Sequence, residues 1–202
     1  MKKPAFSFAA LMIMFLFAFR SATNIDLPLG SPLPQENLKL KDISGKEVSM
    51  KDAMRANGLM VMFSCNTCPV VKGYQSRTLE VCKYAADKNI GVILLNSNEA
   101  TRNDGDSYND MKEYAKEQKY NFNYVVDKNS AMADAFGANR TPEIFMFNKD
   151  GKLVYHGAID DNPGSPDQVT RKHAIIAIDE LVSGKDVSVK ETRSVGCTIK
   201  RI

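Results

Sequence analysis

Residues 59–72, Leu-Met-Val-Met-Phe-Ser-Cys-Asn-Thr-Cys-Pro-Val-Val-Lys, decide the fold of this chain. Their continuous apolar run, residues 59–63, has the length and composition of a buried β-strand. The residues after Pro69 have the pattern of a long helix that ends near residue 87. Cys65 and Cys68 are therefore expected at a turn that leads from a buried strand into a helix.

A Cys-x-x-Cys pair at such a turn predicts a redox active site. Cys65 is expected where free backbone N–H groups and the positive end of the helix dipole stabilise a thiolate. Cys68 follows one helical turn later, close enough for a disulfide. Pro69 suits the first turn of the helix because its missing N–H is not needed there. We therefore take Cys65 and Cys68 as the candidate catalytic residues.

The same spacing also occurs in zinc sites and in purely structural disulfides, and both stay open as alternatives. A tetrahedral zinc site needs two further ligands, usually supplied as a second close pair. The remaining candidates contain no such pair; they are Cys82, Cys197, His156 and His173. We expect no metal and no cofactor.

Cys82 lies in the predicted helix and shares a face with Leu79 and Ala86. This position predicts a packed core thiol. A helix between Cys68 and Cys82 would separate them by about 21 Å, whereas a disulfide allows about 7 Å between Cα atoms. Cys82 is therefore not expected to serve the active site.

Residues 1–22 have the composition of an export signal, in which a short basic head precedes the apolar residues 5–19. This apolar run is short for a membrane span but fits the core of a signal peptide. Arg20 is unfavourable three positions before a cut after Ala22, so an uncleaved signal anchor is the alternative. We expect an exported protein, periplasmic or associated with the cell envelope, that meets a membrane only through an uncleaved N-terminal segment.

The net charge excludes one class of partner. The formal charge is +3, and the leader carries three basic residues and no acidic ones. The remainder therefore holds 24 basic and 24 acidic residues. A neutral body without a basic stripe predicts no nucleic-acid binding. Export also favours persistent disulfides, and all four cysteines follow the leader.

The rest of the chain predicts alternating strands and helices. Strands are predicted at residues 38–40, 47–48, 91–95, 124–126, 144–147 and 152–156. Helices are predicted to begin at Ser49, Ser107 and Ser130, and a last amphipathic helix at residues 167–182. The polar loop near Gly105, which includes Asp106, is expected to face solvent.

The order of these elements, with Cys65-Asn-Thr-Cys68 and Thr141-Pro142 before a hairpin, resembles the thioredoxin superfamily over residues 27–182. The resemblance implies an α/β thioredoxin-like fold with a central mixed β-sheet flanked by helices. It also implies a redox domain at residues 27–183 and a C-terminal tail at residues 184–202. In that family the Thr-Pro bond is cis, faces the cysteines and receives the substrate chain. Thr141 and Pro142 would take this substrate-binding role.

Within the superfamily the chain is similar to the redoxin, or peroxiredoxin-like (AhpC/TSA-related), branch. One group in that branch carries Cys-Asn-His-Cys-Pro and a Gly-Cys-(Ser/Thr)-Ile-Lys tail, which residues 65–69 and 196–200 match except at Thr67. Thr67 removes the charge that a histidine would place beside the thiolate. For Cys197 three roles stay open: a disulfide with Cys82, a third redox cysteine near Cys65, or an ordinary thiol.

These patterns predict an exported thiol-disulfide oxidoreductase whose partners are protein thiols or disulfides, or a reductant protein. Cys65 would attack a partner disulfide, and Cys68 would resolve the mixed disulfide. Glu143 would either move protons or only solvate the strand end. A non-catalytic thioredoxin-fold binding protein is one alternative.

A peroxiredoxin-like thiol peroxidase that reduces hydroperoxides is the other alternative. Peroxiredoxins place a Thr three residues before the reactive cysteine and an Arg beside it. If Cys68 is aligned with that cysteine, Cys65 occupies the Thr position and Pro142 the Arg position. Arg140 is near enough in sequence to substitute for the missing arginine.

Overall fold

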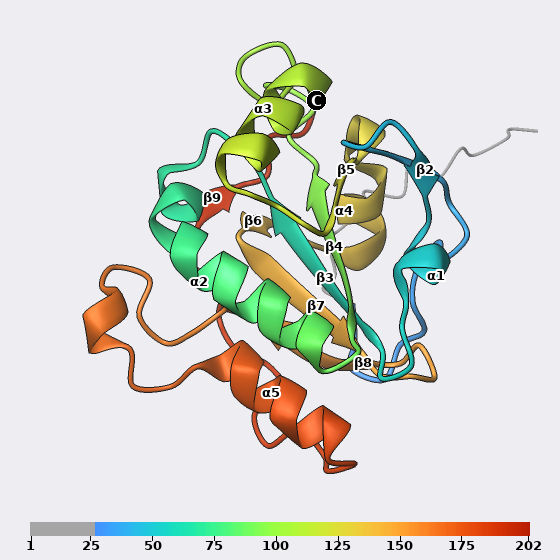
Figure 1. The fold of residues 1–202 in the computed structure, drawn as a ribbon, viewed down its shortest axis with the longest axis vertical. Helices are drawn as coiled ribbons and strands as arrows, with labels where there is room; N and C mark the ends of the chain where they lie inside the picture. The colour runs from blue at the N-terminus through green and yellow to red at the C-terminus, as the bar shows by residue number, and fades with distance from the viewer. Residues whose placement is uncertain (1–26) are drawn as a thin grey trace, which may run out of the picture.

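Seven strands form one mixed β-sheet (Figure 1). They are β1 (Leu40–Asp42), β2 (Glu47–Val48), β3 (Leu59–Ser64), β4 (Gly91–Asn96), β5 (Asn123–Val126), β7 (Glu143–Phe147) and β8 (Leu153–Gly157). Their order is β2-β1-β5-β4-β3-β7-β8; β3, β4 and β5 are parallel, and the other pairs are antiparallel. The computed structural model describes residues 27–202, so the predicted leader at residues 1–22 lies outside the described residues.

Helices cover both faces of this sheet. They are α1 (Met50–Ala53), α2 (Pro69–Asp87), α3 (Tyr108–Glu117), α4 (Ala131–Phe136) and α5 (His173–Val182). In Figure 1, α2 and α5 lie side by side in front of the sheet, and α4 lies behind it. The predicted α/β arrangement, a central mixed sheet flanked by helices, is confirmed.

β3 lies inside the sheet between β4 and β7, and all six of its residues are buried. Successive side chains of a strand point to opposite faces. Met60 and Met62 therefore join the core beneath α2, α3 and α5, whereas Val61 and Phe63 join the core beneath α1 and α4. Burial on both faces explains why β3 is a continuous apolar run rather than an alternating one.

Two of the predicted boundaries are wrong. The first strand is at Leu40–Asp42, not at residues 38–40. The last helix begins at His173, not at residue 167, because Pro166–Gln168 form a separate 3-10 turn, η2. α4 begins directly after Ser130, as predicted, but the capping hydrogen bonds come from Asp127, whose carboxylate accepts the backbone N–H groups of residues 132 and 133 at 2.8 and 2.9 Å.

The tail after α5 folds back onto the sheet. His156 in β8 donates its N–H to the carbonyl of Lys190 and accepts the N–H of Thr192. Further on, the two-residue strand β9 (Cys197–Thr198) pairs antiparallel with β6 (Arg140–Thr141). The sequence pattern does not predict this pair because two residues are too few for a periodic signal.

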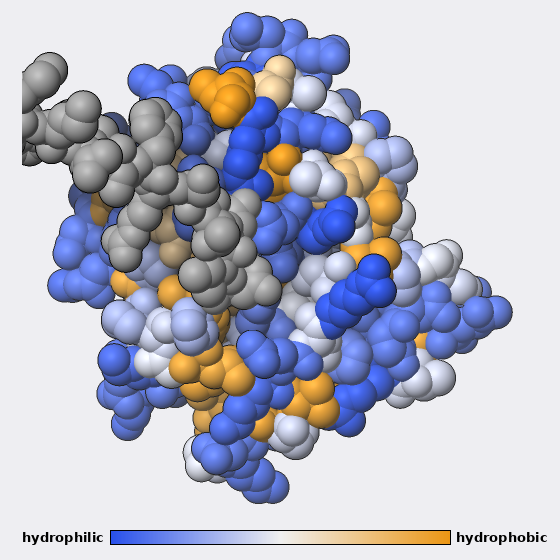
Figure 2. All heavy atoms as spheres, turned by 180° about the vertical axis from the view of Figure 1, so that it is seen from behind, coloured by the Kyte–Doolittle hydropathy of each residue, from blue (hydrophilic) through white to orange (hydrophobic). Residues whose placement is uncertain are grey.

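The face of the molecule in Figure 2 is mainly hydrophilic. On the face in Figure 2, hydrophobic residues form separate small patches among polar ones. Among residues 27–202, none of the helices combines the length and apolar character that a membrane span requires.

A buried ion pair joins α2 to the loop after β8. Arg77 donates to both carboxylate oxygens of Asp160 at 3.0 and 2.8 Å, and Tyr74 also donates to Asp160. The side chains of Arg77 and Asp160 are only 9% and 2% exposed. Removing one partner of such a pair leaves an uncompensated buried charge.

We expect Asp160→Ala to lower the free energy of unfolding by about 3–5 kcal/mol, because Arg77 would stay buried without its partner. Urea denaturation followed by circular dichroism measures this change. Asp87→Ala is the matched control, since Asp87 pairs with Lys83 on an exposed helix face and should cost under about 0.5 kcal/mol. Equal effects for the two variants would contradict the prediction.

Candidate active site

The two candidate catalytic cysteines lie next to the Thr141–Pro142 bond. Cys65 follows β3 directly, and Cys68 is the N-cap residue of α2. The Cys65 Sγ lies 3.4 Å from the hydroxyl oxygen of Thr141, and the Cys68 Sγ lies 3.7 Å from its carbonyl oxygen. The Thr141–Pro142 bond is cis, as the family resemblance implies. Three of the candidate site residues are thus in mutual contact.

The site contains a disulfide between Cys68 and Cys197, with the Cα atoms 6.0 Å apart. Cys65 is a buried thiol next to this bond, so the cysteine pair bonded here is not Cys65 with Cys68. The alternative that pairs Cys197 with Cys82 is wrong. Cys82 is a fully buried thiol in the core beneath α2, as predicted.

Burial raises the pKa of the Cys65 thiol, and the nearby charge of Asp106 raises it further. The Thr141 hydroxyl and the backbone N–H groups of Cys68 and Thr67 act in the opposite direction but are outweighed. Burial therefore disfavours the thiolate form of Cys65 in this state. Cys65 is fully buried in a cluster against which Cys197 packs, so the tail helps to hold water away from its sulfur.

A fully buried carboxylate, Asp106, holds the turn that carries the cysteines. It accepts the Asn66 backbone N–H at 2.9 Å and the Thr67 hydroxyl at 2.9 Å. It also accepts hydrogen bonds from the side chains of Asn96, Asn98 and Thr101. Asp106 was expected in a solvated loop, and that expectation is wrong.

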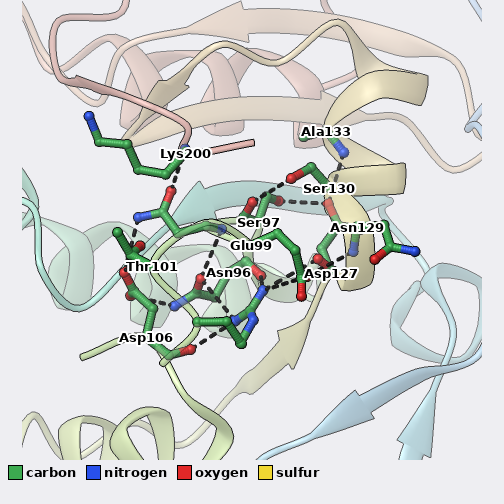
Figure 3. Close-up of polar contacts among 12 residues, drawn as sticks. Asn96, Ser97, Glu99, Thr101, Asp106, Asp127, Asn129, Ser130, Ala133 and Lys200 are labelled. Atoms are coloured by element: carbon green, nitrogen blue, oxygen red, sulfur yellow. Dashed lines mark hydrogen bonds and ion pairs between the residues drawn. The ribbon is translucent and has the colours of Figure 1, made fainter. Parts of the chain in front are cut away.

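Arg102 joins the backbone of Asp106 to the neighbouring strand ends. Its guanidinium donates to the Asp106 carbonyl at 2.9 Å and to the Asn96 carbonyl at 2.9 Å. It also reaches the carbonyl of Asp127, whose carboxylate accepts the Ser97 hydroxyl. Figure 3 shows these contacts gathered where β4 and β5 end. The polar run Asn96-Ser97-Asn98 at the end of a buried strand was the sequence signal for this network.

The Glu143 and Arg140 side chains bind groups other than the sulfurs. The Glu143 carboxylate is buried and accepts the backbone N–H groups of Asn139 and Arg140, and it is 2.9 Å from His156 Nε2. Arg140 is exposed, and its guanidinium donates to the hydroxyl of Thr198 in the tail. Both residues therefore shape the loop before the cis bond.

Among residues 27–202, no three His, Cys, Asp or Glu side chains gather as a metal site would require. The Cys65 thiol lies beside the Cys68–Cys197 disulfide, and Thr141 is close to both, an arrangement that can carry out sulfur exchange.

The AhpC/TSA family profile matches residues 29–156, which is more than half of the chain. The chain belongs to the AhpC/TSA family. The matched region contains both Cys65 and Cys68 and the cis-proline loop, whereas Cys197 lies outside it.

Known proteins extend this comparison. The crystal structure of an uncharacterized conserved protein from Geobacillus kaustophilus is 33% identical, covers 87% of this chain and 93% of its own, and has a TM-score of 0.80. The thiol-disulfide oxidoreductase ResA of Bacillus thuringiensis is 22% identical over 63% of this chain and 68% of its own length. The thioredoxin domain of a Bacteroides vulgatus thiol-disulfide oxidoreductase shares the fold, with a TM-score of 0.54, 20% identity and coverage of 65% of this chain and 89% of its own. The fold of this family member is thioredoxin-like.

In the non-reduced protein we expect iodoacetamide to label Cys65 slowly near neutral pH and faster as the pH rises. The raised pKa keeps the thiol protonated at neutrality, and only the thiolate reacts. Mass spectrometry of labelled peptides over a pH series measures the rate, and Cys82→Ala removes the other thiol as a control. Fast labelling that is independent of pH would refute the buried, protonated Cys65.

Proposed function

We propose that this protein is an exported thiol-disulfide oxidoreductase that acts on protein thiols or disulfides. The observation that carries the proposal is the Cys65 thiol beside the Cys68–Cys197 disulfide, both against Thr141. Thiol-disulfide exchange needs a thiolate, a neighbouring thiol and a docking edge for the partner. The named activity of the ResA relative supports the same reaction class.

In the reducing direction, the Cys65 thiolate attacks one sulfur of a partner disulfide, and the other partner sulfur leaves as a thiolate. Cys68 then attacks the Cys65 sulfur, which releases the second partner thiol and leaves a Cys65–Cys68 disulfide. The partner gains two electrons and two protons, and the protein loses them. Thr141 and Pro142 would bind the partner chain along the exposed side of the loop that contains β6.

Position 67 modulates this reaction. Thr67 donates its hydroxyl to Asp106 and therefore points its polar group toward an anion. A cationic side chain at this position would stabilise the Cys65 thiolate. Without it, the dithiol form is less favoured and the protein is expected to be a weaker oxidant than a histidine-containing counterpart.

The reduced protein is expected to catalyse the reduction of insulin disulfides by dithiothreitol, measured as turbidity. Cys65→Ser should abolish catalysis because it removes the nucleophile, whereas Cys68→Ser should accumulate mixed disulfides because the second step is lost. Cys82→Ala is the matched control, since this thiol lies in the core away from the site.

Hydrogen-peroxide consumption separates this reaction from that of a thiol peroxidase. Peroxide cleavage requires charge-assisted donors that hold both oxygens and the leaving hydroxide. The Arg140 guanidinium is instead exposed and bonded to Thr198. We expect slow consumption, like that of an ordinary exposed thiol. Rapid turnover that is lost in Cys68→Ser and in Arg140→Ala would replace the proposed function by peroxidase activity.

Export is part of the proposal and rests on the leader at residues 1–22. The redox domain at residues 27–183 and the tail at residues 184–202 would then act outside the cytosol, where disulfides persist. N-terminal sequencing of protein from the envelope fraction should find a start between Phe19 and Asn24. An intact Met1 on membrane-bound protein would show an anchor instead, and an intact Met1 in the cytosol would exclude export.

A further inference from the structure

Cys197 lies where a third redox cysteine would be needed. β9 pairs with β6 in a register that sets Cys197 opposite Thr141. Cys197 is bonded to Cys68 and packs against the cluster that contains Cys65. In Figure 1, β9 lies beside β6 near the start of α2. Three sulfurs are thus collected around one residue of the cis-proline loop.

The tail is also held against the domain by contacts other than the disulfide. Ile199 is 3% exposed and packs into the core beneath α4. Its N–H donates to the Asn139 carbonyl at 3.1 Å. The N–H of Lys200 donates to the Asn98 side chain at 3.0 Å, and its carbonyl accepts the N–H of Ala100 at 2.8 Å. These contacts return Cys197 to the same place whenever the tail docks.

The tail also leaves no room for a second chain at β6. Gly196 packs against the Thr141 carbonyl so closely that a Cβ atom there would overlap it. With β9 in place, the backbone groups of Arg140 and Thr141 are paired within the chain. Cys65 is fully buried, whereas Cys197 is partly exposed. When the tail is docked, Cys65, the residue proposed to attack the partner, is therefore buried, whereas Cys197 is partly accessible to solvent.

We propose that Cys197 accepts the disulfide from Cys65, so that the tail acts as a relay between partner and reductant; this inference rests on the proposed function. After the partner has left, the Cys197 thiolate attacks the Cys68 sulfur of the Cys65–Cys68 disulfide. The Cys68–Cys197 bond forms, the Cys65–Cys68 bond breaks, and Cys65 leaves as a thiolate that takes up a proton. The step is redox-neutral, and its product has the disulfide seen in this structure.

The relay separates the two half-reactions in space. Docking of the tail covers β6 and buries Cys65, so the reduced partner cannot re-enter and reverse the reaction. A dithiol reductant protein then attacks the sulfur of Cys197, a residue that is partly exposed, and Cys68 leaves as a thiolate. The second thiol of the reductant resolves the mixed disulfide and frees Cys197, which leaves the reductant oxidised and all three cysteines reduced.

Quenched oxidation of the full-length protein tests the order of the two disulfides. Reduced protein is mixed with oxidised glutathione, quenched with acid at successive times, alkylated and mapped by peptide mass spectrometry. The Cys65–Cys68 disulfide should appear first and be replaced by Cys68–Cys197. Cys197→Ser should stop at the first disulfide. Persistence of Cys65–Cys68 in the wild type, or equally fast formation of Cys68–Cys197 in Cys65→Ser, would overturn the relay.

A pair of tail variants tests whether the buried contacts of Ile199 help to dock the tail. Ile199→Ala removes buried contacts of the docked tail and should shift the equilibrium between the two disulfides toward Cys65–Cys68 by about tenfold or more. Val195→Ala is the matched control, since Val195 is 45% exposed in the same tail, and should leave the ratio unchanged. Equal ratios in both variants would contradict a docked tail that draws the disulfide away from Cys65.

The mapping also separates this inference from the proposed function. Ordered formation of the two disulfides with glutathione, without any insulin reduction, would support the relay and reject the oxidoreductase assignment. Insulin reduction by a wild type that holds only the Cys65–Cys68 disulfide would support the assignment and reject the relay.

Discussion

The buried charge of Asp106 is the constraint on which the geometry of the site depends. A carboxylate removed from water is tolerated only when donors surround it, and Asp106 is fully buried with hydrogen bonds from five side-chain or backbone groups. Two of these donors belong to the turn between Cys65 and Cys68. The hydrogen bonds that the Asp106 carboxylate requires thus fix that turn against the end of β4 and the loop after it. The same carboxylate disfavours a thiolate at Cys65.

The tail adds a second constraint, which can be made and broken by redox chemistry. The Cys68–Cys197 bond joins residues 129 positions apart, and closing so long a loop restricts the unfolded chain by about 5 kcal/mol in the chain-entropy model. Burial of a side chain such as Ile199 contributes about 1.5–3 kcal/mol. The contribution of the disulfide disappears on reduction, whereas that of Ile199 burial remains. Reduction therefore loosens the tail without removing its noncovalent docking contacts.

Much of the fold was predictable because its signals are local. The apolar runs of β3 and β4 and the capping residues Ser49 and Ser107 are confirmed by the structure. Two local features were missed. α5 begins later than predicted because Pro166–Gln168 form a separate 3-10 turn. The carboxylate that caps α4 belongs to Asp127, which lies four residues before the helix and also accepts the Ser97 hydroxyl at the end of β4.

The amino-acid sequence by itself determined the buried strand β3, the Cys-x-x-Cys turn that follows it and the proline loop expected to face it. Each of these features depends on residues that are consecutive in the chain. Only the tertiary structure decided which cysteines are bonded, that Cys65 is a buried thiol, and that Asp106 is an internal anion. Those three properties depend on distances between segments far apart in the chain. Periodicity and spacing report on neighbours along the backbone, whereas disulfide partners and burial are set by packing across the whole domain.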